Sequence, residues 1–236
     1  MNPVIWFDKV RKTFGRVVAV DEVDLQVGPG VFVGLIGHNG AGKSTCLRML
    51  MGLLRPTEGV VTIDGLNVVD DAYAVRKRLG AVPEEPALYE YLTAREFLEF
   101  IAEVRGGGDV GAALELTDLG DDANRLIREY SQGMRRKTAL AAAMLNEPKV
   151  LVLDEALNGL DPPSAARVKA ALRQAVGRGQ TVVLSTHMVE TVQLVSDRVL
   201  MLAHGRVVAD IEAKDVKPGE LEALFLEKMR MDQASS

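Results

Sequence analysis

The chain has a single cysteine, Cys46, and therefore cannot form an internal disulfide. Secreted folds that depend on disulfides are excluded, and a reducing cytosol is the expected compartment. No stretch approaches the ~18 consecutive apolar residues of a membrane-spanning helix. The longest candidates are short apolar runs such as residues 150–153. Charges within residues 1–12 interrupt the apolar run that a signal peptide needs. We expect a chain that does not itself span a membrane.

Basic charge is not in excess either. The 28 lysines and arginines are outnumbered by 33 aspartates and glutamates, which gives a net charge of −5. This balance lacks the electrostatic signature of general nucleic-acid binding, so no nucleic-acid partner is expected. With 47% apolar and 26% charged residues, the composition is that of an ordinary globular protein. Its 236 residues suit one large domain or a core with one inserted lobe.

Apolar runs at residues 31–36, 150–153 and 181–184 are each followed by polar residues and then by helical spacing. Such runs are typical of buried parallel strands joined by crossover helices, so the predicted core is α/β with a mainly parallel sheet. Leu47, Leu50 and Leu54 predict one helix after the first run. Shorter strand-like runs predict an additional antiparallel β layer, formed by residues 4–10, 17–27 and 60–63.

A helical insert is predicted where the strand-like runs disappear, with helices over residues 93–104 and 110–116 separated by three glycines. The tail carries one amphipathic helix with Leu221, Leu224 and Phe225 on one face. We therefore divide the chain into a core of residues 1–82 and 137–215, a helical subdomain of residues 83–136, and a C-terminal helix and tail of residues 216–236.

A phosphate-binding loop is predicted between a strand and a helix, where the sequence fits G-x-x-x-x-G-K-[ST]. Its glycines let backbone N–H groups turn onto phosphate oxygens, Lys43 reaches the β and γ phosphates, and Ser44 offers a hydroxyl to Mg²⁺. The alternative is an ordinary glycine-rich turn. The loop consists of Gly37, His38, Asn39, Gly40, Ala41, Gly42, Lys43, Ser44 and Thr45.

Two adjacent carboxylates, Asp154 and Glu155, follow the run at residues 150–153. Asp154 is placed to hold Mg²⁺ through water, and Glu155 can polarise the attacking water as a general base. His187 follows another predicted strand, so it falls at the same edge of the sheet and could contact the γ-phosphate and the water. The alternatives are a strand followed by a helix cap, and a structural or solvated histidine.

The order and spacing of these motifs, together with residues 130–137 and 158–162, resemble an ABC-type ATPase over residues 4–210. The resemblance implies a phosphate-loop NTPase fold that binds ATP and Mg²⁺. It implies further that the signature residues cap the nucleotide of a second subunit, that Asp161 bridges the two subunits, and that Phe14 stacks on adenine. A phenylalanine buried in the β layer is the alternative for Phe14. The signature residues are Ser131, Gln132 and Gly133.

Several positions depart from the family pattern. Glu84 stands where the family usually has a glutamine, and its carboxylate can bind Mg²⁺ or its waters but lacks the donors of an amide. Tyr130 replaces the usual leucine of the signature, and Gln132 replaces the first of its two glycines. Ala156 and Leu157 replace a Pro-Thr pair, which we interpret as tolerated variation of a loop.

The resemblance is strongest to the multidrug-export type, through Glu84, the signature and residues 88–93. It implies the Mg-dependent ATP-hydrolysing subunit of a transporter, which pairs with a second copy or a homologous ATPase subunit. An integral membrane subunit would dock near residues 84–95 and hold the chain at the cytoplasmic face of the membrane. A soluble ABC-type ATPase that acts as a scaffold or assembly factor is the alternative. A regulator that binds nucleotide without turnover is a more remote one.

Overall fold

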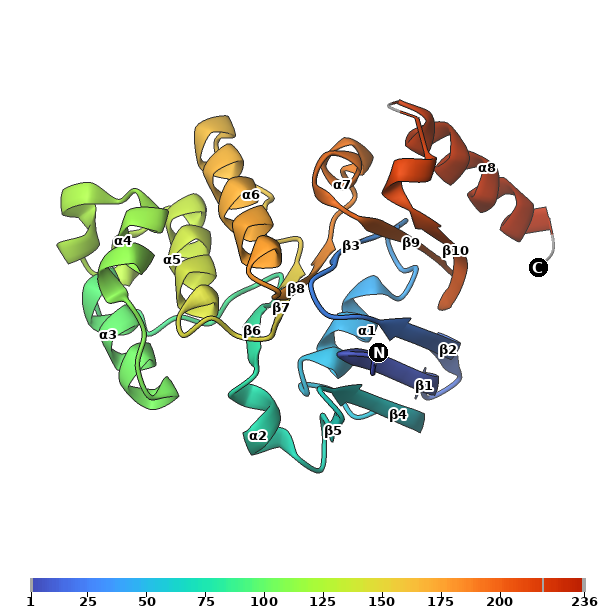
Figure 1. Ribbon diagram of the computed structural model, residues 1–236, viewed down its shortest axis with the longest axis horizontal. Coiled ribbons are helices and arrows are strands. Elements are labelled where there is room, and N and C mark those ends of the chain that lie inside the picture. Colours follow the sequence, from blue (N-terminus) through green and yellow to red (C-terminus); the bar gives the residue numbers. More distant parts are fainter. Residues whose placement is uncertain (1, 218, 235–236) are drawn as a thin grey trace.

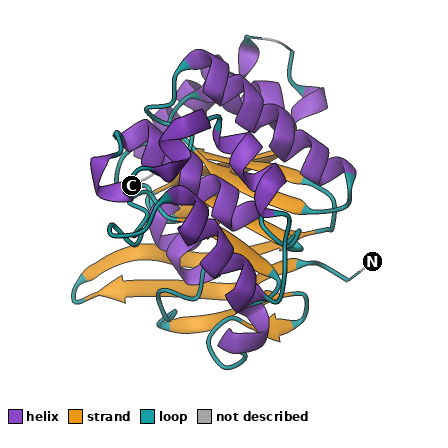
Figure 2. Cartoon of the chain, turned by 90° about the vertical axis from the view of Figure 1, so that its left-hand side faces the viewer, coloured by secondary structure: helices purple, strands orange, loops and turns teal. Residues whose placement is uncertain are grey.

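The computed structural model describes residues 2–217 and 219–234. Figure 1 shows two sheets in the middle and right of the molecule, with a lobe of helices on the left. In Figure 2 strands form the lower part of the molecule and most helices cover its upper part. The fold is the α/β class that the sequence predicts.

The larger sheet has the order β10-β9-β3-β8-β7-β6 in the described part of the chain. Its strands pair in parallel except for β10, which runs antiparallel to β9. Every residue of β3, β7 and β8 is buried, which confirms the three predicted core strands. The strands are β3 (Phe32–Gly37), β6 (Leu79–Val82), β7 (Val150–Asp154), β8 (Thr181–Ser185), β9 (Arg198–Ala203) and β10 (Arg206–Glu212).

The second sheet is the predicted antiparallel layer, with the order β2-β1-β4-β5. Alternate residues of β1, such as Ile5 and Phe7, are buried and face the larger sheet. Period-two burial is the pattern expected of a sheet with one covered face. The strands are β1 (Ile5–Phe14), β2 (Val17–Val27), β4 (Glu58–Ile63) and β5 (Leu66–Asn67).

The helices follow local signals at their ends. Helix α3 begins after Thr93, which forms a capping box with Glu96, and it ends at Gly106 with a positive φ. Asp161 caps α6, whose first two residues are prolines. The helices are α1 (Lys43–Leu50), α2 (Ala72–Arg76), α3 (Ala94–Arg105), α4 (Val110–Thr117), α5 (Gln132–Met144), α6 (Pro162–Gly177), α7 (Val189–Val195) and α8 (Glu220–Ala234), with 3₁₀ turns at Gly120–Asn124, Ile127–Glu129 and Ala213–Asp215.

The predicted helix through Leu54 is wrong at its end, because α1 stops at Leu50. Gly52 takes a φ of 69° just beyond it, the left-handed conformation that closes a helix. Helix α5 runs through the predicted boundary at residues 136–137 without a break, and the division into domains stays a prediction. The C-terminal helix is present as α8, while residues 218, 235 and 236 of the predicted tail lie outside the described residues.

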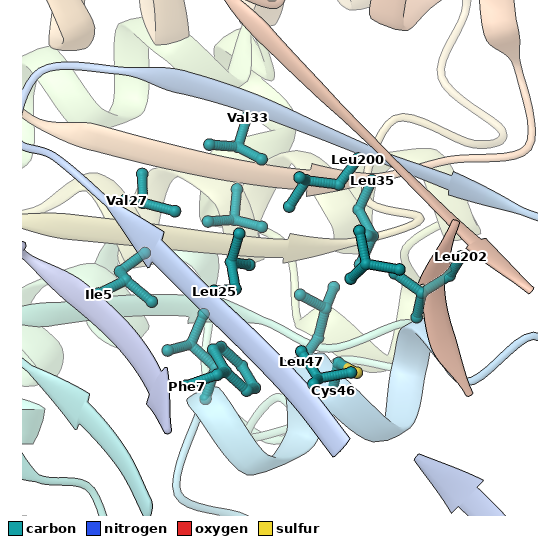
Figure 3. A pocket seen from close by; sticks show the side chains of 14 residues that line it. Ile5, Phe7, Leu25, Val27, Val33, Leu35, Cys46, Leu47, Leu200 and Leu202 are labelled. Carbon is teal, nitrogen blue, oxygen red and sulfur yellow. The ribbon is translucent and has the colours of Figure 1, made fainter. Parts of the chain in front are cut away.

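The core between the two sheets supports the phosphate-loop helix. Apolar side chains from β1, β2, β3, β9 and α1 surround a small cavity of about 30 Å³ (Figure 3). Cys46 and Leu47 of α1 line this cavity, and burial raises the pKa of the Cys46 thiol to about 12. The thiol stays protonated at neutral pH and packs as a small apolar group. This packing fixes α1 beneath the end of β3.

Candidate active site

The predicted phosphate loop joins the end of β3 to the start of α1. Gly40 and Gly42 have φ values of 82° and 102°, a region that favours glycine. A Cβ on Gly42 would lie 2.5 Å from the carbonyl oxygen of Ala19, so only glycine fits there. Lys43 Nζ donates to the carbonyl oxygens of Gly37 at 2.7 Å and His38 at 3.2 Å. The ammonium group therefore lies inside the loop.

Burial and neighbouring carboxylates act on Lys43 in opposite directions. Desolvation lowers the pKa of the buried ammonium group, while Glu155, Asp154 and Glu84 oppose that shift. Glu155 is the strongest of the three opposing charges. The structure thus brings Glu84, from the loop after β6, into the electrostatic surroundings of Lys43. A cation inside a glycine-rich loop, with three carboxylates close enough to act on it electrostatically, suits a ligand that carries both phosphates and a metal ion.

Asp154 is buried at the end of β7 and accepts two hydroxyl donors on the same oxygen. Ser185 Oγ donates to Asp154 Oδ1 at 2.6 Å, and Ser44 Oγ at 3.3 Å. Sequence reasoning assigned no role to Ser185, although it lies in the polar segment that ends β8. Its hydroxyl also accepts the backbone N–H of Glu155 at 3.0 Å. Ser185 therefore holds the carboxylate of Asp154 and the backbone of Glu155.

Glu155 is the first residue after β7 and has a φ of 49°, which is uncommon for a non-glycine residue. Its side chain is 12% exposed, and its Oε2 lies 3.2 Å from Nδ1 of His187. Asn158 Nδ2 donates to the same oxygen at 2.7 Å, a contact that sequence reasoning did not anticipate. His187 is 62% exposed, so its ring reaches the carboxylate from the open side of the site.

Phe14 lies at the end of β1 and is 50% exposed, so the alternative of a buried core phenylalanine is wrong. The ammonium group of Lys12 lies 5.1 Å from the centroid of its ring. A half-exposed ring offers a face on which a base can stack. The role of Phe14 as that platform remains a prediction.

The signature residues lie at the start of α5. Ser131 caps α5 and its Oγ accepts the backbone N–H of Met134 at 3.3 Å, while Gln132 begins the helix. Figure 1 shows α5 in the helical lobe, well to the left of α1, so the structure does not bring the signature to the phosphate loop of the same chain. Asp161 accepts two hydrogen bonds from Ser164 and thereby caps α6, and these bonds hold its carboxyl pKa below the usual range.

Comparison with known proteins identifies the family of this arrangement. The family model described as ABC transporter matches residues 20–158, more than half of the chain. The chain belongs to the ABC transporter family. It is accordingly an ATPase of the ATP-binding-cassette type, as its phosphate loop and paired carboxylates predict.

Within residues 2–217 and 219–234, the helices are all too short or too polar to cross a membrane.

Two curated members of the ABC transporter family show the degree of similarity. Daunorubicin resistance ATP-binding protein DrrA3 of Streptomyces coeruleorubidus is 40% identical over 222 residues, which cover 92% of this chain and 70% of that protein. Nod factor export ATP-binding protein I of Rhizobium etli is 36% identical over 216 residues, which cover 89% of this chain and 68% of that protein.

Solved structures agree with the family assignment. An ATP-binding subunit of an ABC transporter superimposes with a TM-score of 0.89 at 28% identity, covering 95% of this chain and 99% of that one. A dimeric ATP-binding cassette in a post-hydrolysis state, bound to ADP and Pi, has a TM-score of 0.81 at 27% identity and covers 89% of this chain and 98% of that one. Both neighbours confirm the phosphate-loop NTPase fold.

Proposed function

We propose that this chain hydrolyses Mg·ATP at the carboxyl ends of β3, β7 and β8 and thereby powers export through a separate membrane subunit. The observation that carries the proposal is the convergence of Lys43, Asp154, Glu155 and His187 at this one edge of the sheet. Ligands bind at the carboxyl ends of parallel strands in α/β folds, and these four side chains supply the groups that phosphoryl transfer to water requires.

Each residue has a distinct part in the proposed reaction. Backbone N–H groups of the loop and the ammonium group of Lys43 bind the β and γ phosphates. Glu155 accepts a proton from the attacking water, and His187 beside it helps to orient the water and the γ-phosphate. Hydroxyl and carboxylate oxygens are the donors that Mg²⁺ prefers, so Ser44, Asp154 and Glu84 fit a magnesium site. Bound Mg²⁺ would supply charge neutralisation on the phosphates.

A second ATPase subunit would complete the site. Ser131 caps α5, and Gln132 and Gly133 form its first turn. Figure 1 shows α5 in the helical lobe, away from α1, which follows the phosphate loop. The dimeric state of the ADP-bound neighbour supports a shared arrangement. Two copies, or this chain and a homologous subunit, would therefore enclose two Mg·ATP between a phosphate loop and the opposite signature. Asp161 would bridge the two subunits, and closing and opening of the dimer would follow binding and hydrolysis.

The names of the relatives support a membrane partner and the direction of transport. One is a drug-resistance protein and another is an export protein. A groove of about 390 Å³ lies where the loop after β6 meets α5, within the region predicted to dock the membrane subunit. Docking there would place the chain at the cytoplasmic face of the membrane. The groove is lined by Glu84, Glu85, Pro86, Gln132, Arg135 and Arg136.

Copurification tests the membrane partner. The tagged chain, expressed in its natural host, should be recovered from detergent-solubilised membranes together with an integral membrane protein in a fixed ratio. Recovery from the soluble fraction alone, with full ATPase activity and no membrane partner, would favour the scaffold or assembly factor instead. Mg-dependent ATP hydrolysis by the same preparation excludes a regulator without turnover.

Mixing two inactive variants tests the shared site. Lys43→Ala should fail at phosphate binding, and Ser131→Arg should bind ATP yet block closure, because a bulky cation replaces the hydroxyl at the opposite γ-phosphate. In a mixed dimer one site carries both lesions and the other carries neither. Turnover of the mixture should therefore exceed that of either variant alone. Wild-type turnover of Ser131→Arg would show that the signature does not complete the active site.

A further inference from the structure

Asn158 lies in the loop between β7 and α6, three residues after Glu155. Its side-chain Nδ2 donates to Glu155 Oε2 at 2.7 Å, and its backbone N–H donates to the carbonyl oxygen of Glu155 at 3.1 Å. His187 Nδ1 contacts the same carboxylate oxygen at 3.2 Å. Both side-chain contacts fall on Oε2, so they hold the carboxylate by one oxygen and fix the direction in which the group points.

The backbone of Glu155 makes this support necessary. Its φ of 49° lies in the left-handed region, which non-glycine residues occupy where surrounding contacts impose it. Ser185 holds the backbone N–H of Glu155 through both its carbonyl oxygen, at 3.2 Å, and its hydroxyl, at 3.0 Å. Ser185 thus fixes the backbone, while Asn158 provides the closest contact to the carboxylate itself.

The loop that carries Asn158 is held in turn by the signature helix. Nη1 of Arg136 in α5 donates to the carbonyl oxygen of Asn158. The first turn of α5 also packs on the next residue of the loop, because a Cβ on Gly133 would lie 3.2 Å from the carbonyl oxygen of Gly159. Arg136 lines the groove between α5 and the loop after β6 as well. A continuous series of contacts therefore runs from this groove through α5 and Asn158 to Glu155.

We propose that Asn158 is a positioning residue for Glu155, and that Arg136 holds Asn158 in place so that the orientation of the general base follows the position of the signature helix in the same chain. The inference rests on the proposed function, in which Glu155 is the base. A shift of α5 would then change the rate of hydrolysis without changing the binding of ATP.

Steady-state hydrolysis of Mg·ATP by the purified full chain tests the role of Asn158. Asn158→Ala keeps the backbone bond to Glu155 and loses only the side-chain donor. Asn158→Asp keeps the shape of the side chain but replaces the donor with a second carboxylate. Both variants should lower kcat by about 10- to 100-fold, the loss expected when a catalytic group is displaced by about 1 Å, with a KM for ATP within about twofold of wild type. Asn124→Ala, at an exposed asparagine of the helical lobe, is the matched control.

Variants of Arg136 test whether this arginine holds Asn158 in place. Arg136→Ala should lower kcat by roughly threefold to tenfold, the effect of one lost hydrogen bond, and Arg136→Lys, which keeps a cationic donor, should restore most of that loss. Arg167→Ala removes a comparable arginine that pairs with Asp118 at 2.9 Å, and it serves as the control. If the two residues act in series, the double variant should be no slower than Asn158→Ala alone.

The outcomes separate this inference from the proposed function. Wild-type kcat in both Asn158 variants overturns the positioning role, and so does a rise in KM that matches the fall in kcat, because it would indicate a loop that serves binding. Additive losses in the double variant overturn the link through Arg136. Glu155→Gln is measured in parallel. If it is inactive while the Asn158 variants are normal, only the inference fails, whereas normal turnover of Glu155→Gln removes the base itself.

Discussion

Glu155→Gln is the substitution that examines the proposed chemistry most directly. It exchanges a carboxylate for an amide of nearly the same shape, so the packing around the residue is preserved. The amide oxygen can still accept the bond that Asn158 Nδ2 now donates to Oε2. The backbone contacts of residue 155 with Ser185 are untouched. The variant therefore loses the basic oxygen and one negative charge and little else.

The expected loss of hydrolysis rate follows from the proposed role of Glu155 as the general base. A positioned general base contributes about 10²- to 10⁴-fold to a rate, which corresponds to roughly 2.7 to 5.4 kcal/mol of barrier at 1.36 kcal/mol per tenfold change. ATP binding should be kept or become tighter, because Glu155 is the strongest carboxylate influence on Lys43 and its removal takes a negative charge away from the phosphates. Hydrolysis should fall while nucleotide affinity does not.

Three measurements check this expectation. Release of phosphate gives turnover, binding of a fluorescent ATP analogue gives affinity, and light scattering with and without Mg·ATP shows whether the variant accumulates as a dimer. Glu190→Gln, at an exposed carboxylate in the first turn of α7, is the matched control and should behave as wild type. Turnover of Glu155→Gln at the wild-type rate would refute the reasoning, because no base would then be needed at this position.

The remaining predictions concern other parts of the site and the fold. Glu84→Gln should change the dependence of activity on Mg²⁺ and Mn²⁺ more than it changes ATP binding, and superimposable titration curves would remove Glu84 from the metal site. Phe14→Ala should weaken ATP binding by roughly 5- to 150-fold, since stacking contributes about 1–3 kcal/mol per base, whereas Phe14→Trp should bind normally; equal affinities of Phe14→Ala and wild type in a fluorescence titration would contradict the stacking role. Asp64 has a lowered pKa because it accepts from Lys149 and Arg78, so its stabilisation is present above the ordinary carboxylate pKa and is lost as the pH falls. Asp64→Asn should therefore lower stability by about 1 kcal/mol at pH 7, with a difference in thermal melting that disappears as the pH falls through the lowered pKa of Asp64, and a difference that persists once the carboxyl group is protonated would point to another cause.

The local sequence pattern was sufficient to predict the strands and the loop that carry the site. The strands β3, β7 and β8 are continuous apolar runs because both faces of the parallel sheet are covered, and this burial makes them visible in the sequence. Their polar ends fall at one edge because neighbouring strands pair in parallel. The phosphate loop, Asp154, Glu155 and His187 could therefore be placed together before any contact was known.

Strands without a distinctive local pattern, such as β6 and β10, were not predicted. Strand β6 has only four residues, and it contains Gly80, a residue type that is typical of turns. In the structure a Cβ on Gly80 would lie 2.1 Å from the carbonyl oxygen of Ala143, so the glycine is needed where α5 crosses the strand. Strand β10 is an edge strand whose residues are exposed or half-buried, and such a segment lacks the continuous apolar run of a core strand.

Site residues were missed where their role depends on contacts that the local sequence does not reveal. Spacing along the chain identifies Glu155 because a buried strand ends there, but the direction of its carboxylate depends on contacts made across the fold. Ser185, thirty residues away in sequence, accepts the backbone N–H of Glu155 with its carbonyl oxygen and its hydroxyl, and Arg136 reaches the loop after Glu155 from the helical lobe. Only Asn158 is close in sequence, and an asparagine three residues after a glutamate carries no signal of its own. The chemical groups of this site are thus encoded locally, while the geometry in which they act is set by the packing of α5 against the loop before α6.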